Sequence, residues 1–432
     1  MGKVAFARIG LGVACAVAWV AACSSDSAGP DGMSSSGSVP ADASDERDRA
    51  TGGDAAASGD GSDDAASSDG APEEVDAGPP AVQLIGRFDA RQAAGPKCAW
   101  AGCRILARFE GTQVSVDLEE IDETWMEGAP SEWDVAVDDV WKPKIVTTPG
   151  KRTYSIATGL AAGPHKVELY KRSEPQNGVT RFVGFDFGGG ALLAPPPRAT
   201  RRIEIVGDSA ASGFGVEGVG YPDNDCPGVD YGASWQNFRK SFGALLGTTL
   251  GAEVHGTAYS GKGLVKNIWR PDTAAMPYLF SLANPIDFSS TYDFAWKPDV
   301  VVVMIGGNDF ALGQPDETAG NGPATAAEFL AAYRTFVGTL RTTYPDAHLI
   351  LTVSPSVSDS DPPGRSTRTN IANATTTVAA ERTAASDARV HAFAPNVATP
   401  SELTACNGHG TPALHARVAG ELAVFVKQTT GW

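Results

Sequence analysis

The chain has 432 residues and a formal net charge of −17, with 51 Asp and Glu against 34 Lys and Arg residues. Much of this charge lies between residues 24 and 80, where 14 acidic side chains accompany 2 basic ones. The remainder is mildly acidic and has no basic stripe, which argues against nucleic acid as a partner. The length after residue 80 fits roughly two domains.

Residues 1–22 have the layout of a secretory signal peptide. Lys3 and Arg8 give a positive start, and the apolar run that follows is shorter than the about 20 residues that cross a bilayer. The small residues before Cys23 resemble the bacterial lipoprotein box, in which the cysteine is lipidated and becomes the mature N-terminus. We therefore expect an exported protein, anchored to the bacterial membrane (outer membrane or cell surface) only through this lipid. A plain cleaved signal and a short buried helix are the alternatives.

Residues 23–80 are mainly Ser, Ala, Gly, Asp and Pro, with hardly an aliphatic cluster. Such a segment cannot bury enough apolar surface to offset the entropy lost on ordering, and its like charges keep it extended. We predict a disordered acidic linker. Calcium binding is the weaker alternative, because no loop has regularly spaced ligands.

Residues 81–197 are predicted to form an all-β sandwich or jelly-roll domain. Apolar and polar residues alternate in CRILARFEGTQVSVDLEE (103–120), GPHKVELYKRS (163–173) and TRFVGFDFGG (180–189), and no helical period is sustained. Many short strands punctuated by Gly and Pro are typical of sandwiches and jelly rolls.

Residues 198–432 change to alternating strands and helices. The predicted strands are RRIEIVGD (201–208), AEVHGTAYS (252–260), PDVVVVMIGG (298–307), HLILTVSPS (348–356) and ARVHAFAP (388–395). The predicted helices cover 235–250, 325–344, 368–385 and 412–428. Runs such as DVVVVMI are apolar on both faces, as in a buried parallel sheet. The pattern predicts a three-layer α/β domain with a flavodoxin-like parallel sheet.

Four polar blocks stand at strand ends or before the last helix: Gly207-Asp208-Ser209, Ser260-Gly261-Lys262-Gly263, Gly306-Gly307-Asn308-Asp309 and His409. In a parallel sheet, reactive groups gather beyond the carboxyl ends of the strands. A serine needs a base, usually histidine, to become a nucleophile, and attack on an ester creates an oxyanion that needs fixed donors. Each block alone is also an ordinary turn, but together they predict a serine hydrolase.

These blocks, in this order, resemble the SGNH (GDS-type) hydrolase superfamily over residues 203–426. The resemblance implies Ser209 as the nucleophile and His409 as the base. It implies an oxyanion hole made of the Ser209 N–H, the Gly261 N–H and the Asn308 side-chain amide. His415 lies on the apolar stripe of the last helix, so we interpret it as structural.

The stretches RFEGTQVSVDL, GLAAGPHKVELYKRSE, WKPDVVVVMIGGNDF and ACNGHGTPALH resemble carbohydrate esterase family two, over residues 84–427. The resemblance implies a jelly roll ahead of an SGNH domain and removal of O-acetyl groups from polysaccharides such as xylan and glucomannan, without a metal or organic cofactor. Trp269, Tyr278 and Trp296 are weak candidates for stacking on a sugar. The alternatives are an esterase of lipid or aryl esters and a non-catalytic glycan-binding surface lipoprotein.

Besides Cys15 in the signal and Cys23, the chain has four cysteines, and an even number in an exported protein favours disulfides. The family resemblance implies the pair Cys226–Cys406. Cys98 and Cys103 are close enough in sequence to pair with each other. Free or differently paired thiols are the alternative.

The residue two before His409 is Asn407, where many members of the resembled family have an aspartate. The ring of His409 is then oriented by Asn407, by a backbone carbonyl, or by an acid from another loop. We favour a Ser209–His409 dyad with backbone help, because a carbonyl can fix the tautomer although it brings no charge. A second departure is Ala210-Ala211, where the family usually has a larger aliphatic residue and then Thr.

The lipid anchor yields the first testable prediction. Cys23→Ser removes the thiol that would be lipidated, so it should leave the precursor uncleaved at this site or release the protein from membranes. Cell fractionation with immunoblotting measures both outcomes. Unchanged membrane association of the variant would contradict lipidation at Cys23.

Overall fold

The computed structural model describes residue 79 and residues 81–121, 130–221, 224–227, 232–313, 317 and 321–432. The described residues all belong to one compact unit, Pro72–Trp432. The predicted signal peptide, Cys23 and nearly all of the acidic linker lie outside them. Within the described part, no helix combines the length and apolarity that crossing a membrane requires.

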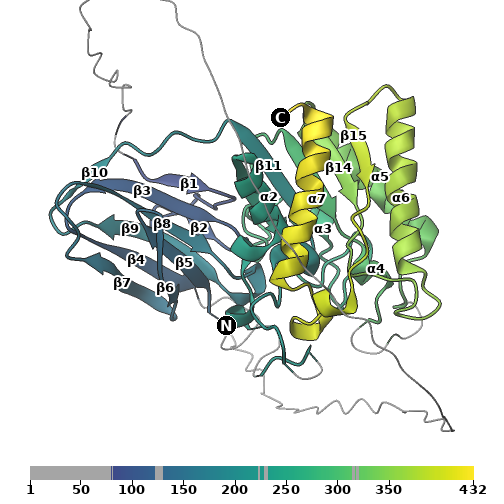
Figure 1. Cartoon of the computed structure of the whole chain (residues 1–432), viewed down its shortest axis with the longest axis horizontal. Coiled ribbons are helices and arrows are strands. Elements are labelled where there is room, and N and C mark those ends of the chain that lie inside the picture. The colour runs from purple at the N-terminus through teal and green to yellow at the C-terminus, as the bar shows by residue number, and fades with distance from the viewer. Residues whose placement is uncertain are drawn as a thin grey trace, which may run out of the picture. The chain divides into compact units, whose positions relative to one another are not determined.

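The first domain consists of two antiparallel sheets (Figure 1). One has the order β1-β3-β8-β5-β6, with β10 also paired to β3, and the other has the order β2-β9-β4-β7. The strands are β1 (Gln83–Ile85), β2 (Lys97–Cys98), β3 (Arg104–Glu110), β4 (Gln113–Ile121), β5 (Glu132–Val137), β6 (Val140–Val146), β7 (Gly150–Thr158), β8 (Pro164–Lys171), β9 (Val179–Asp186) and β10 (Ala191–Leu193), with the 3-10 turn η1 (Pro175–Asn177) between β8 and β9.

Strand β4 shows why these residues form sheets. Val114, Val116 and Leu118 are buried while their neighbours are more exposed, which is the two-residue period of a strand with one face on a core. The prediction of a strand-rich first domain is confirmed. Its jelly-roll topology stays a prediction.

The second domain is built on a five-stranded parallel sheet of order β12-β11-β13-β14-β15. In order along the chain this is 2-1-3-4-5, the flavodoxin-like order. The strands are β11 (Arg201–Gly207), β12 (Ala252–Ala258), β13 (Val300–Met304), β14 (His348–Thr352) and β15 (Val390–Phe393). Every residue of β13 is buried, as its continuous apolar run predicts.

Helices cover both faces of this sheet (Figure 1). The helices are α1 (Ser209–Ser212), α2 (Phe242–Leu250), α3 (Met276–Leu279), α4 (Gly307–Phe310), α5 (Ala326–Thr343), α6 (Thr367–Ala384) and α7 (Pro412–Thr430). Further 3-10 turns are η3 (Ala233–Trp235), η4 (Phe238–Lys240), η5 (Pro400–Glu402) and η6 (Cys406–Gly408). Side chains of α2 and α7 pack against one face of the sheet, and those of α5 and α6 pack against the other. The predicted parallel sheet with helices is confirmed.

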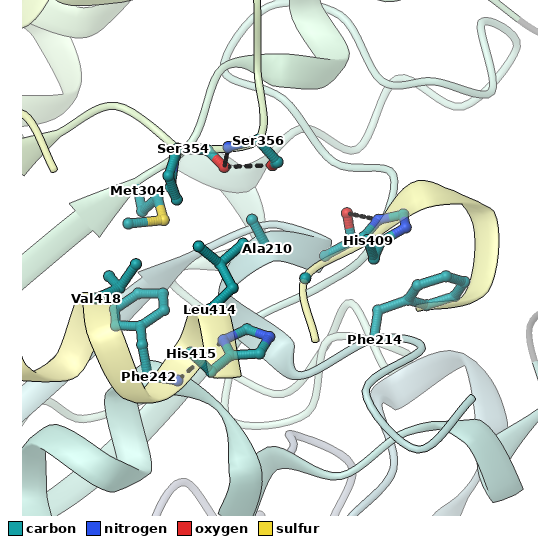
Figure 2. Close-up of a pocket in the computed structure, with 13 residues that line it drawn as sticks. Ala210, Phe214, Phe242, Met304, Ser354, Ser356, His409, Leu414, His415 and Val418 are labelled. Carbon is teal, nitrogen blue, oxygen red and sulfur yellow. Dashed lines mark hydrogen bonds between the residues drawn. The ribbon is translucent and has the colours of Figure 1, made fainter. Parts of the chain in front are cut away.

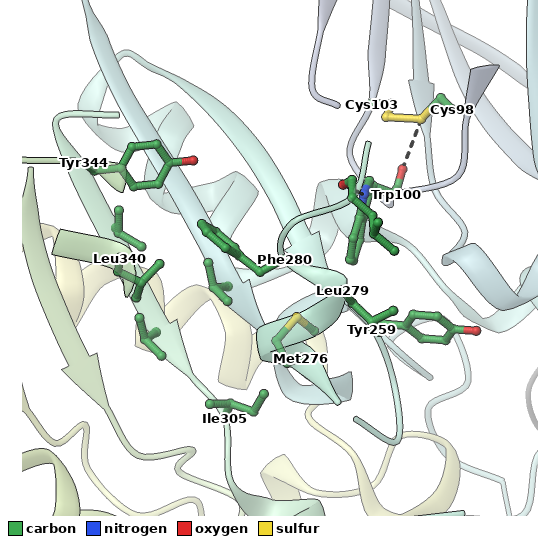
Figure 3. Close-up of a cluster of buried hydrophobic side chains, with 14 of the residues drawn as sticks. Cys98, Trp100, Cys103, Tyr259, Met276, Leu279, Phe280, Ile305, Leu340 and Tyr344 are labelled. Carbon is green, nitrogen blue, oxygen red and sulfur yellow. Dashed lines mark hydrogen bonds between the residues drawn. A yellow bond between two sulfur atoms is a disulfide. The ribbon is translucent and has the colours of Figure 1, made fainter. Parts of the chain in front are cut away.

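The two domains share a hydrophobic core (Figure 3). Trp100 of the first domain is fully buried in the same cluster as Leu279 and Phe280 of the second. Its indole Nε1 donates to the carbonyl of Leu282 at 3.3 Å. The Cys98–Cys103 disulfide holds the loop that carries Trp100. The first domain is therefore packed on the second as part of one interior.

A buried ion pair crosses the same interface. The guanidinium of Arg87 contacts the Glu204 carboxylate on β11 at 2.6 Å, and both side chains are fully buried. Arg87 also donates to the Phe280 carbonyl, and its guanidinium lies 4.3 Å from the ring centre of Tyr292. Burial lowers the pKa of Arg87, but Glu204 and the neighbouring tyrosines outweigh it and hold the pKa above its usual value. Arg87 therefore stays charged.

Arg87→Met should destabilise the protein, because it leaves the Glu204 carboxylate buried without its cation. Breaking one side of such a pair costs about 3–5 kcal/mol. The double variant Arg87→Met/Glu204→Gln should recover part of this loss, because the buried charge is gone. Urea unfolding of both variants and the wild type measures the difference. A single variant as stable as the wild type would mean that the pair does not hold the interface.

Candidate active site

Ser209 stands just beyond the carboxyl end of strand β11, as the first residue of α1. The carboxylate of Asp208 caps this short helix by accepting the Ala210 N–H at 3.0 Å. Gly207 permits the close packing beneath, since a Cβ there would lie 2.4 Å from the Met304 carbonyl oxygen of β13. The strand end and the cap together fix the position of Ser209.

The structure brings Ser209 and His409 into contact across 200 residues of sequence. His409 Nε2 lies 2.8 Å from Ser209 Oγ (Figure 2). His409 Nδ1 lies 3.1 Å from the carbonyl oxygen of Cys406. A carbonyl only accepts, so Nδ1 carries the hydrogen and Nε2 presents its lone pair to the serine hydroxyl. This is the tautomer that a general base requires.

The partner of Nδ1 is thus a backbone carbonyl, and the side chain of Asn407 is exposed. Asn407 adopts a left-handed conformation, with φ of 54°, which Asn tolerates better than most residues. This backbone turn aims the Cys406 carbonyl at the ring. Of the three orienting groups considered from the sequence, the geometry matches the carbonyl.

The pKa of His409 is lowered from its usual value, chiefly by burial and despite its hydrogen bonds to the backbone of Cys406 and Asn407. The ring is therefore neutral at pH 7 and able to accept a proton. As pH falls through the lowered pKa, the ring is protonated and loses its ability to act as a base. The Phe214 ring packs against it, with 4.5 Å between ring centres.

Asn308, on α4, lines a cleft of about 340 Å³ together with Ser209 and His409. Its Nδ2 donates to the carbonyl of Lys262 at 2.9 Å. Gly261 directly precedes Lys262 and has φ of +77°, and a Cβ at this position would lie 2.7 Å from Ile268. The Asn308 amide is therefore hydrogen-bonded to the same turn that carries the Gly261 N–H.

The role of Asp309 in shaping this region was not predicted from the sequence. The buried Asp309 carboxylate accepts three backbone N–H groups, from residues 264, 265 and 266, at 2.6–3.0 Å. Burial raises its pKa to about 6, although these hydrogen bonds lower it. Arg270 supports the same region by donating to the Asn308 carbonyl at 3.2 Å. The sequence does show an acidic residue directly after Asn308, but an aspartate at this position is equally typical of an ordinary turn.

A second, small pocket of about 20 Å³ lies beside Ser209 (Figure 2). Its walls include Ala210, Met304, Leu414 and Ser354, whose hydroxyl is 2.7 Å from that of Ser356. These two serines were not predicted from the sequence, because they follow β14 without any motif.

His415 also borders this small pocket, and it is buried. Its Nδ1 accepts the backbone N–H of Phe242 at 3.2 Å. Burial, with a smaller effect of His409, lowers its pKa to about 4. A neutral histidine bonded to the backbone fits the structural interpretation made from the sequence.

The aromatic candidates divide into two groups. Trp296 stacks on His255 with 3.5 Å between ring centres, and its Nε1 donates to Glu253. Trp269 and Tyr278 are about half exposed. Trp296 is therefore held by the fold, which makes it a poor candidate for sugar stacking.

The structure contains a disulfide between Cys226 and Cys406. It links the segment after the nucleophile turn to the residue whose carbonyl orients His409. Gly218 packs directly against it, since a Cβ there would lie 2.1 Å from the Cys406 sulfur. The position of the Cys406 carbonyl is thus tied covalently to the loop opposite.

A serine bonded to a neutral histidine at the carboxyl edge of a parallel sheet is the arrangement of a serine hydrolase. The chain also matches two known protein families. Residues 205–421 match the GDSL-like lipase/acylhydrolase family, and residues 84–197 match the carbohydrate esterase 2 N-terminal family. The first match covers half of the chain, and the chain belongs to the GDSL-like lipase/acylhydrolase family.

Individual proteins are similar over both domains. The cellulase/esterase CelE of Acetivibrio thermocellus is 32% identical over 277 residues, which is 64% of this chain but only 31% of CelE. An acetylxylan esterase/glucomannan deacetylase of Cellvibrio japonicus is 26% identical over 283 residues, which is 64% of this chain and 72% of that protein. The structure of a family two carbohydrate esterase from Clostridium thermocellum, in complex with cellohexaose, has a TM-score of 0.72 and 28% identity, covering 82% of this chain and all of that one.

The orientation of His409 by the Cys406 carbonyl leads to a prediction at Asn407. Asn407→Ala should change kcat little, because the exposed amide does not hold the ring, whereas His409→Ala should remove most of the activity. Steady-state hydrolysis of an aryl acetate measures both, with circular dichroism as the control for folding. Loss of activity in a folded Asn407→Ala protein would show that the amide orients the ring.

Proposed function

We propose that this protein is a serine esterase that removes O-acetyl groups from polysaccharides of the xylan or glucomannan type. The observation that carries the proposal is the 2.8 Å contact between Ser209 Oγ and His409 Nε2, in a cleft open to solvent. The names of the relatives, acetylxylan esterase/glucomannan deacetylase among them, support the substrate class. No metal or organic cofactor takes part in the proposed reaction.

The reaction begins when Ser209 Oγ attacks the acetyl carbonyl carbon and His409 Nε2 takes the hydroxyl proton. We assign the Ser209 N–H, the Gly261 N–H and the Asn308 amide as donors to the oxyanion. The Asn308 amide nitrogen carries two hydrogens, and the Lys262 carbonyl engages one.

His409 then returns its proton to the departing sugar oxygen, leaving an acetyl ester on Ser209. Water, deprotonated by the same histidine, attacks this ester and releases acetate. The Cys406 carbonyl holds the ring but brings no full negative charge to the imidazolium, so some stabilisation that an aspartate gives is absent.

The small pocket beside Ser209 favours acetyl over longer acyl groups. Its volume of about 20 Å³ is little more than the about 10–15 Å³ that one water-sized probe occupies. Ala210, Met304 and Leu414 close it. We therefore rank an esterase of long-chain lipid esters, or of bulky aryl esters, behind the acetyl esterase.

The first domain, the lipid anchor and the acidic linker also have roles in the proposed function. We propose that the first domain is a jelly roll that helps to shape the cleft. We also propose that the mature protein is exported and held at the bacterial membrane by a lipid on Cys23. The acidic linker would then let the folded part reach insoluble or surface-bound polysaccharide.

The test is acetate release from acetylated xylan, acetylated glucomannan and long-chain aryl esters, with the wild type beside Ser209→Ala. We expect release of acetate from at least one polysaccharide, and its loss in Ser209→Ala, because Ser209 Oγ is the hydroxyl that His409 Nε2 contacts. Faster hydrolysis of long-chain esters would favour the lipid esterase. Binding of glycans without any acetate release would favour the non-catalytic alternative.

A further inference from the structure

A buried carboxylate of the first domain reaches the turn that precedes Gly261. Glu174 lies between β8 and η1 and is fully buried. Its Oε2 accepts the backbone N–H of Ser260 at 2.6 Å, and its Oε1 accepts the Ser260 hydroxyl at 2.7 Å. Ser260 is the residue directly before Gly261. Both carboxylate oxygens of Glu174 therefore accept hydrogen bonds from the turn that leads to Gly261.

The same carboxylate also contacts the helix that carries the nucleophile. The Ser212 hydroxyl lies near this carboxylate and lowers its pKa, and it donates a hydrogen bond to the carbonyl oxygen of Ser209 at 3.2 Å. Ser212 is the last residue of α1, and Ser209 is the first. One side chain of the first domain therefore connects the two segments that carry the Ser209 and Gly261 N–H groups.

We propose that Glu174 is a positioning residue of the oxyanion hole, and that the first domain takes part in catalysis through it. The inference rests on the proposed function, in which these two N–H groups stabilise the oxyanion. A carboxylate that holds Ser260 by two hydrogen bonds and packs beside Ser212 fixes the separation of the two segments. The donors can act only if they point at one oxygen position, and a misplacement of about 1 Å can cost about 10²-fold in rate.

The surroundings of Glu174 are charged and buried. Lys171 of β8 faces it, and so does Asp208, on the turn between β11 and α1. Burial raises the pKa of Glu174 to about 7, although its hydrogen bonds with Ser260 and Ser212 lower it. A protonated carboxyl points its own hydrogen at one of these donors. The contact between Glu174 and Ser260 therefore weakens as the pH falls through the pKa of Glu174. Asp208, whose pKa is also raised to about 7 by burial, titrates alongside.

The experiment compares Glu174→Ala and Glu174→Gln with the wild type in the full chain. The first readout is kcat and KM for an aryl acetate. The second is the rate at which a fluorophosphonate labels Ser209, which needs no polysaccharide but does need the oxyanion donors. Glu174→Ala should lower kcat and the labelling rate about 10²-fold with a small change in KM, and Glu174→Gln should lose less, because its amide oxygen still accepts one bond.

Glu120→Gln is the matched control. Glu120 is also a buried carboxylate of the first domain that accepts one backbone N–H, from Ser131, and one hydroxyl, from Thr180. These contacts all lie within the first domain, so the variant should keep wild-type kcat even if its unfolding temperature drops. In Glu174→Gln, the acid limb of the kcat profile should move to lower pH, since the carboxyl that titrates is gone and its charge no longer raises the pKa of Asp208.

If Glu174→Ala does not fold, a double-mutant cycle replaces it. The cycle compares Ser260→Ala, Glu174→Gln and the double variant. The loss of kcat in the double variant should be smaller than the two single losses combined, because both single changes remove the same contact. Additive effects, or wild-type kcat and labelling in folded Glu174 variants, would overturn the inference. A wild type that labels readily but releases no acetate from polysaccharide would reject only the proposed function.

Discussion

The continuous burial between the two domains is the constraint on which the rest of the structure depends. Trp100 and Arg87, both from the first domain, are fully buried against Leu282, Phe280 and Glu204 of the second. Separating the domains would expose this apolar surface and leave a charge pair to be solvated again. Because separating the domains costs free energy, a side chain of the first domain can hold a turn of the second with the precision that catalysis needs.

The histidine shows how the fold replaces a missing carboxylate. The Cys406 carbonyl fixes the tautomer of His409, and the disulfide from Cys406 to Cys226 fixes that carbonyl in turn. An aspartate would orient the ring and also stabilise its positive charge in the transition state. Here the orientation comes from covalent and backbone geometry, and a carbonyl brings no full negative charge to the ring.

Three buried carboxylates hold the backbone turns around the proposed oxyanion donors, and each accepts hydrogen bonds from backbone N–H groups. Asp208 caps the nucleophile helix, Asp309 gathers the loop at 264–266, and Glu174 holds Ser260. Burial raises the pKa of all three above the usual range for carboxyl groups. The protein thus accepts the cost of buried acids where turns of the backbone must be held rigidly.

The sequence by itself determined the local elements and pointed to Ser209 and His409 as the candidate reacting groups. The alternation in β4, the apolar run of β13 and the polar blocks at Ser209 and His409 are visible in the sequence because they depend on neighbours in the chain. Only the tertiary structure decided that a carbonyl, and not Asn407, orients His409, and that Glu174 meets Ser260. The first depends on the left-handed backbone conformation of Asn407 within one turn, and the second joins residues 86 positions apart. Neither leaves a periodic or spaced pattern in the sequence, and the second arises only when separate elements pack together.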